Sequence, residues 1–126
     1  MPKRTCVLAV DNSATSRREI SDNLSRQGFD VVQAENGREG LDALNRGNID
    51  IVVSDIDLPQ MDGFSFVRHM RGDPRHANLP VLILTRETNR ALRTEGKVAG
   101  ANAWMLKPVD LKHLVETLRR MSSHAA

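Results

Sequence analysis

The chain has 126 residues, of which 40% are hydrophobic, and its 18 basic and 16 acidic residues leave a formal net charge of +2. This length and composition predict one globular domain over residues 1–126, with a hydrophobic core of its own. The small basic surplus is scattered among acids and accompanied by only 3 Phe, 1 Trp and no Tyr, so we expect no nucleic-acid partner.

Five short apolar runs rich in β-branched residues predict five β-strands. The runs are 6–10, 31–34, 49–53, 81–84 and 103–106. The longest unbroken run, Cys6 to Val10, is far shorter than the roughly 20 residues of a membrane-spanning helix, so we expect no membrane partner and a cytoplasmic protein. Hydrophobicity that is continuous rather than alternating predicts strands buried on both faces, as in a parallel sheet between helices.

Helical spacing of apolar residues separates these strands. Ile20 and Leu24 indicate the first helix, and Asn36 and Glu39 are placed as N-cap and capping-box residue of a short second one. Glycines are expected to end the first four helices. They are Gly28, Gly47, Gly72 and Gly100.

The third helix is expected from about residue 64 to residue 70. Leu92, Val98 and Ala99 supply the apolar spacing of the fourth helix, and Asp110 is the expected N-cap of the fifth. Alternation of five strands with five helices predicts an α/β fold, a five-stranded parallel doubly wound sheet with right-handed crossovers.

Polar residues directly follow four of the five predicted strands. They are Asp11 and Asn12, Ser54 and Asp55, Thr85, and Lys107, which is followed by Pro108. Because the carboxyl ends of parallel strands meet at one edge of the sheet, we expect these residues to form one site. Each of them alone could be a helix cap or one partner of a surface ion pair. Their recurrence at four strand ends favours a chemical site.

Carboxylate and amide oxygens at this edge are ligands that Mg²⁺ prefers. A carboxylate beside such a metal can attack phosphorus as a nucleophile and form an acyl phosphate. Lys107 would then offset the charge of the transferred group, and the Thr85 hydroxyl would donate a hydrogen bond to it. These residues therefore indicate phosphoryl transfer.

The segment from Ser54 to Gly63, Ser-Asp-Ile-Asp-Leu-Pro-Gln-Met-Asp-Gly, resembles the receiver domains of two-component response regulators. The segment from Gly96 to Trp104 is similar to the chemotaxis subgroup in particular, the stand-alone regulators of the CheY type. The resemblance covers essentially the whole chain. It implies a flavodoxin-like sheet with strand order 2-1-3-4-5.

This resemblance implies that Asp55 accepts a phosphoryl group from a phosphohistidine of a histidine kinase. Thr85 would be the switch hydroxyl and Lys107 the conserved-type lysine before a cis-prone proline. The implied Mg²⁺ ligands are Asp11, Asn12, Asp55 and the backbone carbonyl of Asp57. The chain would not be an enzyme beyond autocatalytic phosphotransfer and autodephosphorylation.

The family also implies an output face formed by the fourth helix, the fifth strand and the fifth helix. Phosphorylation would change the affinity of this face for a protein partner, such as a flagellar motor switch component. Trp104 stands at the position of the family's aromatic switch, where Tyr or Phe is commoner; the alternative is a partly buried aromatic residue without a switching role. Arg86 and Glu87, which follow the switch Thr85, are assigned to the same region.

Two residues depart from the family pattern near the acceptor. Asn12 stands where a second acid is usual, which should weaken Mg²⁺ binding, and the side chain of Asp57 could restore part of the lost charge. Arg86 stands where a small residue is usual. It could cover the acceptor, pair with Asp57 or Glu87, or lie solvated on the surface.

Three other functions compete with a phosphorylated switch. The first is a degenerate receiver that binds its partner without phosphate, which Asn12 and Arg86 favour; a phosphate sink or relay intermediate is also open, because a receiver sequence does not name its partner. The second is a small aspartyl-phosphate phosphatase of the haloacid-dehalogenase type, disfavoured because Pro59 does not fit its motif. The third is a flavin-binding module, disfavoured because no Ser-, Thr- or Gly-rich phosphate loop follows the first strand.

Overall fold

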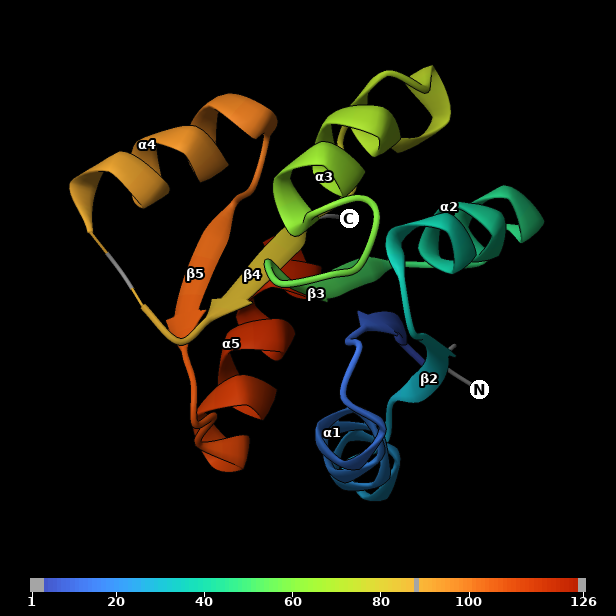
Figure 1. The fold of residues 1–126 in the computed structure, drawn as a ribbon. Coiled ribbons are helices and arrows are strands. Elements are labelled where there is room, and N and C mark those ends of the chain that lie inside the picture. The colour runs from blue at the N-terminus through green and yellow to red at the C-terminus, as the bar shows by residue number, and fades with distance from the viewer. Residues whose placement is uncertain (1–3, 88, 125–126) are drawn as a thin grey trace.

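A computed structural model describes residues 4–87 and 89–124, which form one sheet with helices on both faces (Figure 1). Five parallel strands are ordered β2-β1-β3-β4-β5, as predicted. The strands are β1 (Cys6–Val10), β2 (Asp30–Ala34), β3 (Ile51–Asp55), β4 (Val81–Thr85) and β5 (Ala103–Leu106). The helices are α1 (Ala14–Arg26), α2 (Gly37–Arg46), α3 (Gly63–Arg71), α4 (Arg90–Ala99) and α5 (Leu111–His124), with a short 3₁₀ helix over Pro74–His76.

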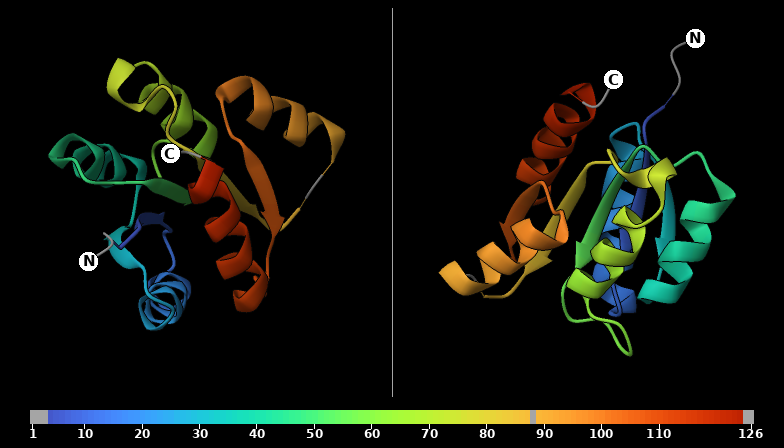
Figure 2. Two further views of the ribbon diagram at one scale, coloured as in Figure 1. Left: turned by 180° about the vertical axis from the view of Figure 1, so that it is seen from behind. Right: turned by 90° about the horizontal axis from the view of Figure 1, so that it is seen from above.

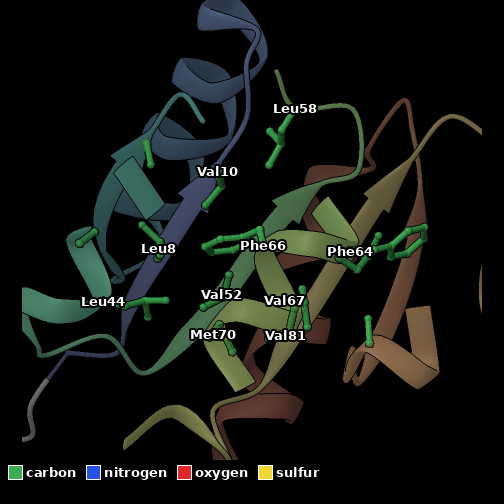
Figure 3. Close-up of a cluster of buried hydrophobic side chains, with 14 residues drawn as sticks. Leu8, Val10, Leu44, Val52, Leu58, Phe64, Phe66, Val67, Met70 and Val81 are labelled. Atoms are coloured by element: carbon green, nitrogen blue, oxygen red, sulfur yellow. The ribbon is translucent and has the colours of Figure 1, made fainter. Parts of the chain in front are cut away.

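The sheet separates two hydrophobic clusters. Phe66 and Met70 of α3 pack with Leu44 of α2 against one face, as Figure 3 shows. Leu24 of α1 and Leu118 of α5 pack against the other face, and Figure 2, seen from behind and from above, shows these two helices on that side. Helices on both faces explain why the central strands are apolar at almost every position. In the described part of the chain, no helix is long and apolar enough to cross a membrane.

Burial on both faces holds for the central strands but was wrong for the two outer ones. In β2, Val31 and Val32 are only partly buried and Gln33 is exposed. In β5, Leu106 is 48% exposed. Both strands lie at the edges of the sheet, where the helix layers cover them incompletely.

Strand β3 begins two residues later than expected and extends to the acceptor candidate. The predicted run started at Ile49, but Ile49 precedes the strand and packs against the α2–α3 side. The register pairs Ile51 with Val7 and Asp55 with Leu84. Asp55 is therefore the last residue of the central strand, fixed by the sheet rather than by a flexible loop.

The helix ends largely follow the expected capping residues. The Asn36 side chain accepts a hydrogen bond from the N–H of Glu39 at 2.8 Å, while Glu39 accepts from the N–H of Glu35, one residue before the cap, at 3.1 Å. Three of the four predicted stop glycines have positive φ, but Gly72 is right-handed at φ −68°. Val98 was misplaced as a helix-packing residue, since it is 80% exposed on the outer surface of α4.

Candidate functional site

A cleft of about 610 Å³ opens where the strands deliver their carboxyl ends. Its lining includes Asp11, Asn12, Asp55, Asp57, Arg86 and Lys107. These residues follow β1, β3, β4 and β5, or end them, so they are far apart in the sequence. The sheet edge thus brings together six of the residues singled out from the sequence.

The floor of the cleft holds one ammonium between two carboxylates. The Lys107 Nζ lies 2.9 Å from the Asp55 Oδ2 and 3.4 Å from the Asp11 Oδ2. The side chains are 13%, 11% and 4% exposed for Lys107, Asp55 and Asp11. Partial burial reduces solvent screening of this attraction. The peptide bond between Lys107 and Pro108 is cis.

Strand alternation explains why these three side chains meet. Successive residues of a strand point to opposite faces, so Asp11 continues the row of Val7 and Ala9. Asp55 and Lys107 likewise continue rows that face the α1–α5 side, which includes Val53 and Met105. The three charged groups therefore lie at the end of the same face of the sheet.

Thr85 belongs to the opposite row, and the structure does not bring its hydroxyl into the charged cluster. It continues the row of Val81 and Ile83, which face the α2–α3–α4 side. The hydroxyl donates to the Glu87 carbonyl oxygen at 2.8 Å and accepts from the Glu87 N–H at 3.2 Å. Both of these hydrogen bonds of the Thr85 hydroxyl are therefore made with the neighbouring backbone. The hydroxyl does not cap α4, because the N-cap of that helix is Asn89.

Two residues that sequence reasoning did not single out hold Asp11 in place. The N–H of Ser13 donates to the Asp11 Oδ1 at 2.9 Å, and Ser13 also caps α1. The Arg17 guanidinium donates to the Asp11 carbonyl oxygen at 2.7 Å. Ser13 was recognisable as a capping residue type directly after the strand. No local pattern pointed to Arg17, because its bond depends on how α1 folds back beside β1.

Gly63 fixes the loop after β3. Its N–H donates to the Ile56 carbonyl oxygen at 2.8 Å. A Cβ at this position would overlap the carbonyl oxygen of Asp55 and lie 2.8 Å from the Ile56 Cα. The sequence contained this glycine in the recognised segment without revealing its reason, which is this close approach to the Asp55 backbone.

The donor set at the cleft fits Mg²⁺ better than a metal that needs many protein ligands. Among the described residues, no group of three or more Asp, Glu, His or Cys side chains is placed to hold a metal ion. Asp11 and Asp55 supply two carboxylates, and the Asn12 side chain adds an amide in the open cleft. Mg²⁺ is commonly bound through one or two carboxylates and keeps several waters, which this arrangement allows.

Arg86 lines the cleft as an exposed residue, and it forms no ion pair with Asp57, Glu87 or any other residue in the described ranges. Trp104 lies outside the cleft and is partly buried. Its ring stacks on Phe64 of α3, with centroids 6.1 Å apart and an interplanar angle of 13°. The Trp104 side chain therefore packs between its own strand, β5, and the helices on the α4 side.

Comparison with known proteins agrees with this architecture. The family model described as the response regulator receiver domain matches residues 7–119. The chemotaxis protein CheY of Pseudomonas aeruginosa is 35% identical over 116 residues, which are 91% of this chain and 94% of that protein. Protein PilH of the same organism is 32% identical over 112 residues, covering 89% and 93% of the two chains. The solved structure of Vibrio cholerae CheY4 has a TM-score of 0.91 at 37% identity and covers 94% of this chain and 99% of that one.

Proposed function

Since this chain belongs to the response regulator receiver domain family, in its CheY-like branch, we propose that it is a phosphoacceptor switch with Asp55 as the acceptor. The observation that carries the proposal is the Lys107 ammonium held between the carboxylates of Asp55 and Asp11 on the floor of an open cleft. We also propose that residues 1–126 form a single receiver domain, which the family match over residues 7–119 supports.

These positions support the following reaction. An Asp55 carboxylate oxygen forms a bond to the phosphorus of a phosphohistidine, and the phosphorus–nitrogen bond of the donor breaks. The imidazole nitrogen leaves with that electron pair and is available for a proton, while Asp55 becomes an acyl phosphate. Lys107 offsets the charge of the phosphoryl oxygens at short range, so the chain contributes mainly positioning and charge compensation.

Mg²⁺ would be held by Asp11, Asp55, the Asn12 amide and the backbone carbonyl of Asp57. When bound, it supplies further positive charge to the oxygens of the transferred group. The Asp11 carboxylate would then have two tasks, to bind Mg²⁺ and to hold Lys107. Arg17 fixes the Asp11 backbone for both.

Switching would begin at the Thr85 hydroxyl. A phosphoryl oxygen on Asp55 is a stronger, charged acceptor than the Glu87 carbonyl that the hydroxyl contacts now. A shift of Thr85 toward Asp55 would break this bond and move the segment that leads into α4. The outer face of α4 and β5 carries exposed Val98 and Leu106, which suit a protein partner. The partners proposed are a histidine kinase and an output protein such as a flagellar motor switch component.

The test is transfer of radiolabelled phosphate from a phosphorylated histidine kinase encoded near this chain. Wild type should take the label and Asp55→Asn should not. Asp62→Asn is the matched control, because Asn caps a helix as well as Asp and residue 62 caps α3 in the same loop. Label on Asp55→Asn would overturn the assignment of the acceptor. Turnover of a generic phosphomonoester by wild type would favour the phosphatase alternative instead.

A receiver that binds its partner without phosphate is the second candidate. The neutral Asn12 in the metal pocket and the bulky Arg86 in the cleft favour it. Partner affinity measured with and without beryllofluoride distinguishes the two functions. A switch changes its affinity with this phosphoryl analogue, and a degenerate receiver does not.

A further inference from the structure

The Arg86 guanidinium is an uncommitted cation at the mouth of the acceptor cleft. It lines the same cleft as Asp55 and Lys107, is exposed, and forms no ion pair within the described residues. Lys107, in contrast, is already shared by two carboxylates at 2.9 and 3.4 Å. Of these two cations, Arg86 is therefore the one whose charge is free to serve an incoming group.

The charges that line the cleft favour a further positive charge near a phosphoryl group. Among the described lining residues, three are carboxylates and two are cations. An acyl phosphate on Asp55 carries about one negative charge more than the carboxylate it replaces. Asn12 supplies no charge to attract a metal, and Arg86 adds a positive charge that repels one. Both residues shift the cleft from binding metal toward binding anions.

Guanidinium chemistry suits this task. The planar fork of an arginine can donate two parallel hydrogen bonds to a phosphoryl group, which a neutral small residue cannot do. Arg86 directly follows Thr85, the last residue of β4, and β4 lies beside β3 in the sheet. The cation is thus attached to a rigid strand end next to the acceptor strand.

We propose that Arg86 is a specificity-determining residue of the phosphoryl site, which binds the oxygens of the phosphoryl group on Asp55 and takes over part of the charge compensation otherwise left to Mg²⁺. This proposal rests on the proposed phosphoacceptor function. It makes two separate statements: Arg86 strengthens binding of a phosphoryl group, and it weakens binding of Mg²⁺ to the unphosphorylated chain.

The experiment compares wild type with Arg86→Ala, Arg86→Lys and the control Arg90→Ala. The control removes the same charge from an exposed position four residues further on, outside the cleft lining. Binding of beryllofluoride is followed by ¹⁹F NMR at several Mg²⁺ concentrations. Binding of Mg²⁺ alone is followed by isothermal titration calorimetry.

In Arg86→Ala we expect beryllofluoride affinity to fall about tenfold at low Mg²⁺, the size of a lost charge-assisted hydrogen bond. We expect its affinity for Mg²⁺ alone to rise about threefold, because a repelling charge is removed. Arg86→Lys should keep the weaker Mg²⁺ binding but recover only part of the beryllofluoride affinity, since an ammonium lacks the planar fork.

Two results would overturn the proposal. Arg86→Ala could match Arg90→Ala in both measurements, which would place Arg86 among solvated surface residues. Arg86→Ala could instead bind beryllofluoride more tightly, which would make Arg86 an obstacle to the acceptor. Failure of wild type itself to bind beryllofluoride would contradict the phosphoacceptor function, and it is thereby distinguished from these results.

Discussion

The rings of Phe64 and Trp104 stack with their centroids 6.1 Å apart, and this pair joins the start of α3 to β5. Phe64 directly follows Gly63, which lies against the backbone of Asp55. Gly96 of α4 completes the arrangement, because a Cβ there would lie 2.6 Å from the Trp104 Cζ3. The Phe64–Trp104 stack and the close approach of these two glycines therefore connect the loop after Asp55 to α4.

Gly96→Ala should destabilise the chain by about 1–3 kcal/mol, as expected for overpacking against an aromatic ring. Helix propensity alone predicts the opposite sign, a gain of about 1 kcal/mol, so the sign of the change identifies the cause. Urea unfolding measures it, and Trp104 is a direct reporter because it is the only Trp in the sequence. A stabilised variant with unchanged Trp fluorescence would show that α4 does not press on this ring.

Gly63→Ala should slow phosphorylation of Asp55 by more than its loss of stability alone explains, because the added methyl group must displace the Asp55 carbonyl. Gly37→Ala is the matched control. Its Cβ would meet the Met61 side chain at 2.9 Å, and a flexible methionine can move aside. The rate of labelling by a small phosphodonor, measured on folded protein, should fall about tenfold or more only in Gly63→Ala. Equal rates in both variants would contradict this role of Gly63.

Sequence patterns located the five strands, because continuous apolar runs marked strands whose ends coincide with polar residues, whereas the strand order was implied by the family resemblance. Asp11, Asp55 and Lys107 could be placed at one edge by the rule that parallel strands share a carboxyl end. The rule did not predict that Thr85 faces the opposite side of the sheet. The face to which a residue points depends on where β4 starts relative to the helices, and the rule does not give that. Arg17 was not identified from the sequence because the group that it holds at the site is the backbone carbonyl oxygen of Asp11, which side-chain patterns do not indicate.

Asn12→Asp should tighten Mg²⁺ binding by about tenfold, which corresponds to about 1.4 kcal/mol. The change adds a carboxylate to a cleft that already contains Asp11 and Asp55, and hard cations prefer charged oxygen ligands. Calorimetric titration of the unphosphorylated chain checks this expectation. The substitution Asn45→Asp, at an exposed position of α2 outside the cleft lining, controls for net charge. Similar affinities in the two variants would mean that residue 12 does not contact the metal.

Acid stability should depend on Asp73, which caps the 3₁₀ helix. Hydrogen bonds from the Arg75 side chain and backbone lower the pKa of Asp73 to about 2. A carboxylate with a lowered pKa in the folded state contributes stability above its unfolded pKa and loses it as the pH falls. The contribution should thus disappear between pH values of about 4 and about 2. Unfolding midpoints across this range should fall less steeply for Asp73→Asn than for wild type, and parallel curves would contradict the assignment.

Arg71 joins the end of α3 to the loop between α4 and β5, and its loss should destabilise the chain without removing the acceptor. Its guanidinium donates to the carbonyl oxygens of Gly100 at 2.8 Å and His76 at 2.8 Å, and to the Asn102 side chain at 2.9 Å. Burial lowers the pKa of Arg71 from its ordinary value.

Arg71→Ala removes all three hydrogen bonds, of which those to Gly100 and His76 are partly buried, and we expect this loss to cost about 2–3 kcal/mol in the free energy of unfolding. Arg71→Lys should recover little of it, because an ammonium cannot reproduce the fork that reaches three partners. Below the unfolding temperature, both variants should still be labelled on Asp55, since Arg71 does not line the acceptor cleft. Full stability in Arg71→Lys would show that charge, rather than the shape of the guanidinium, holds these segments together.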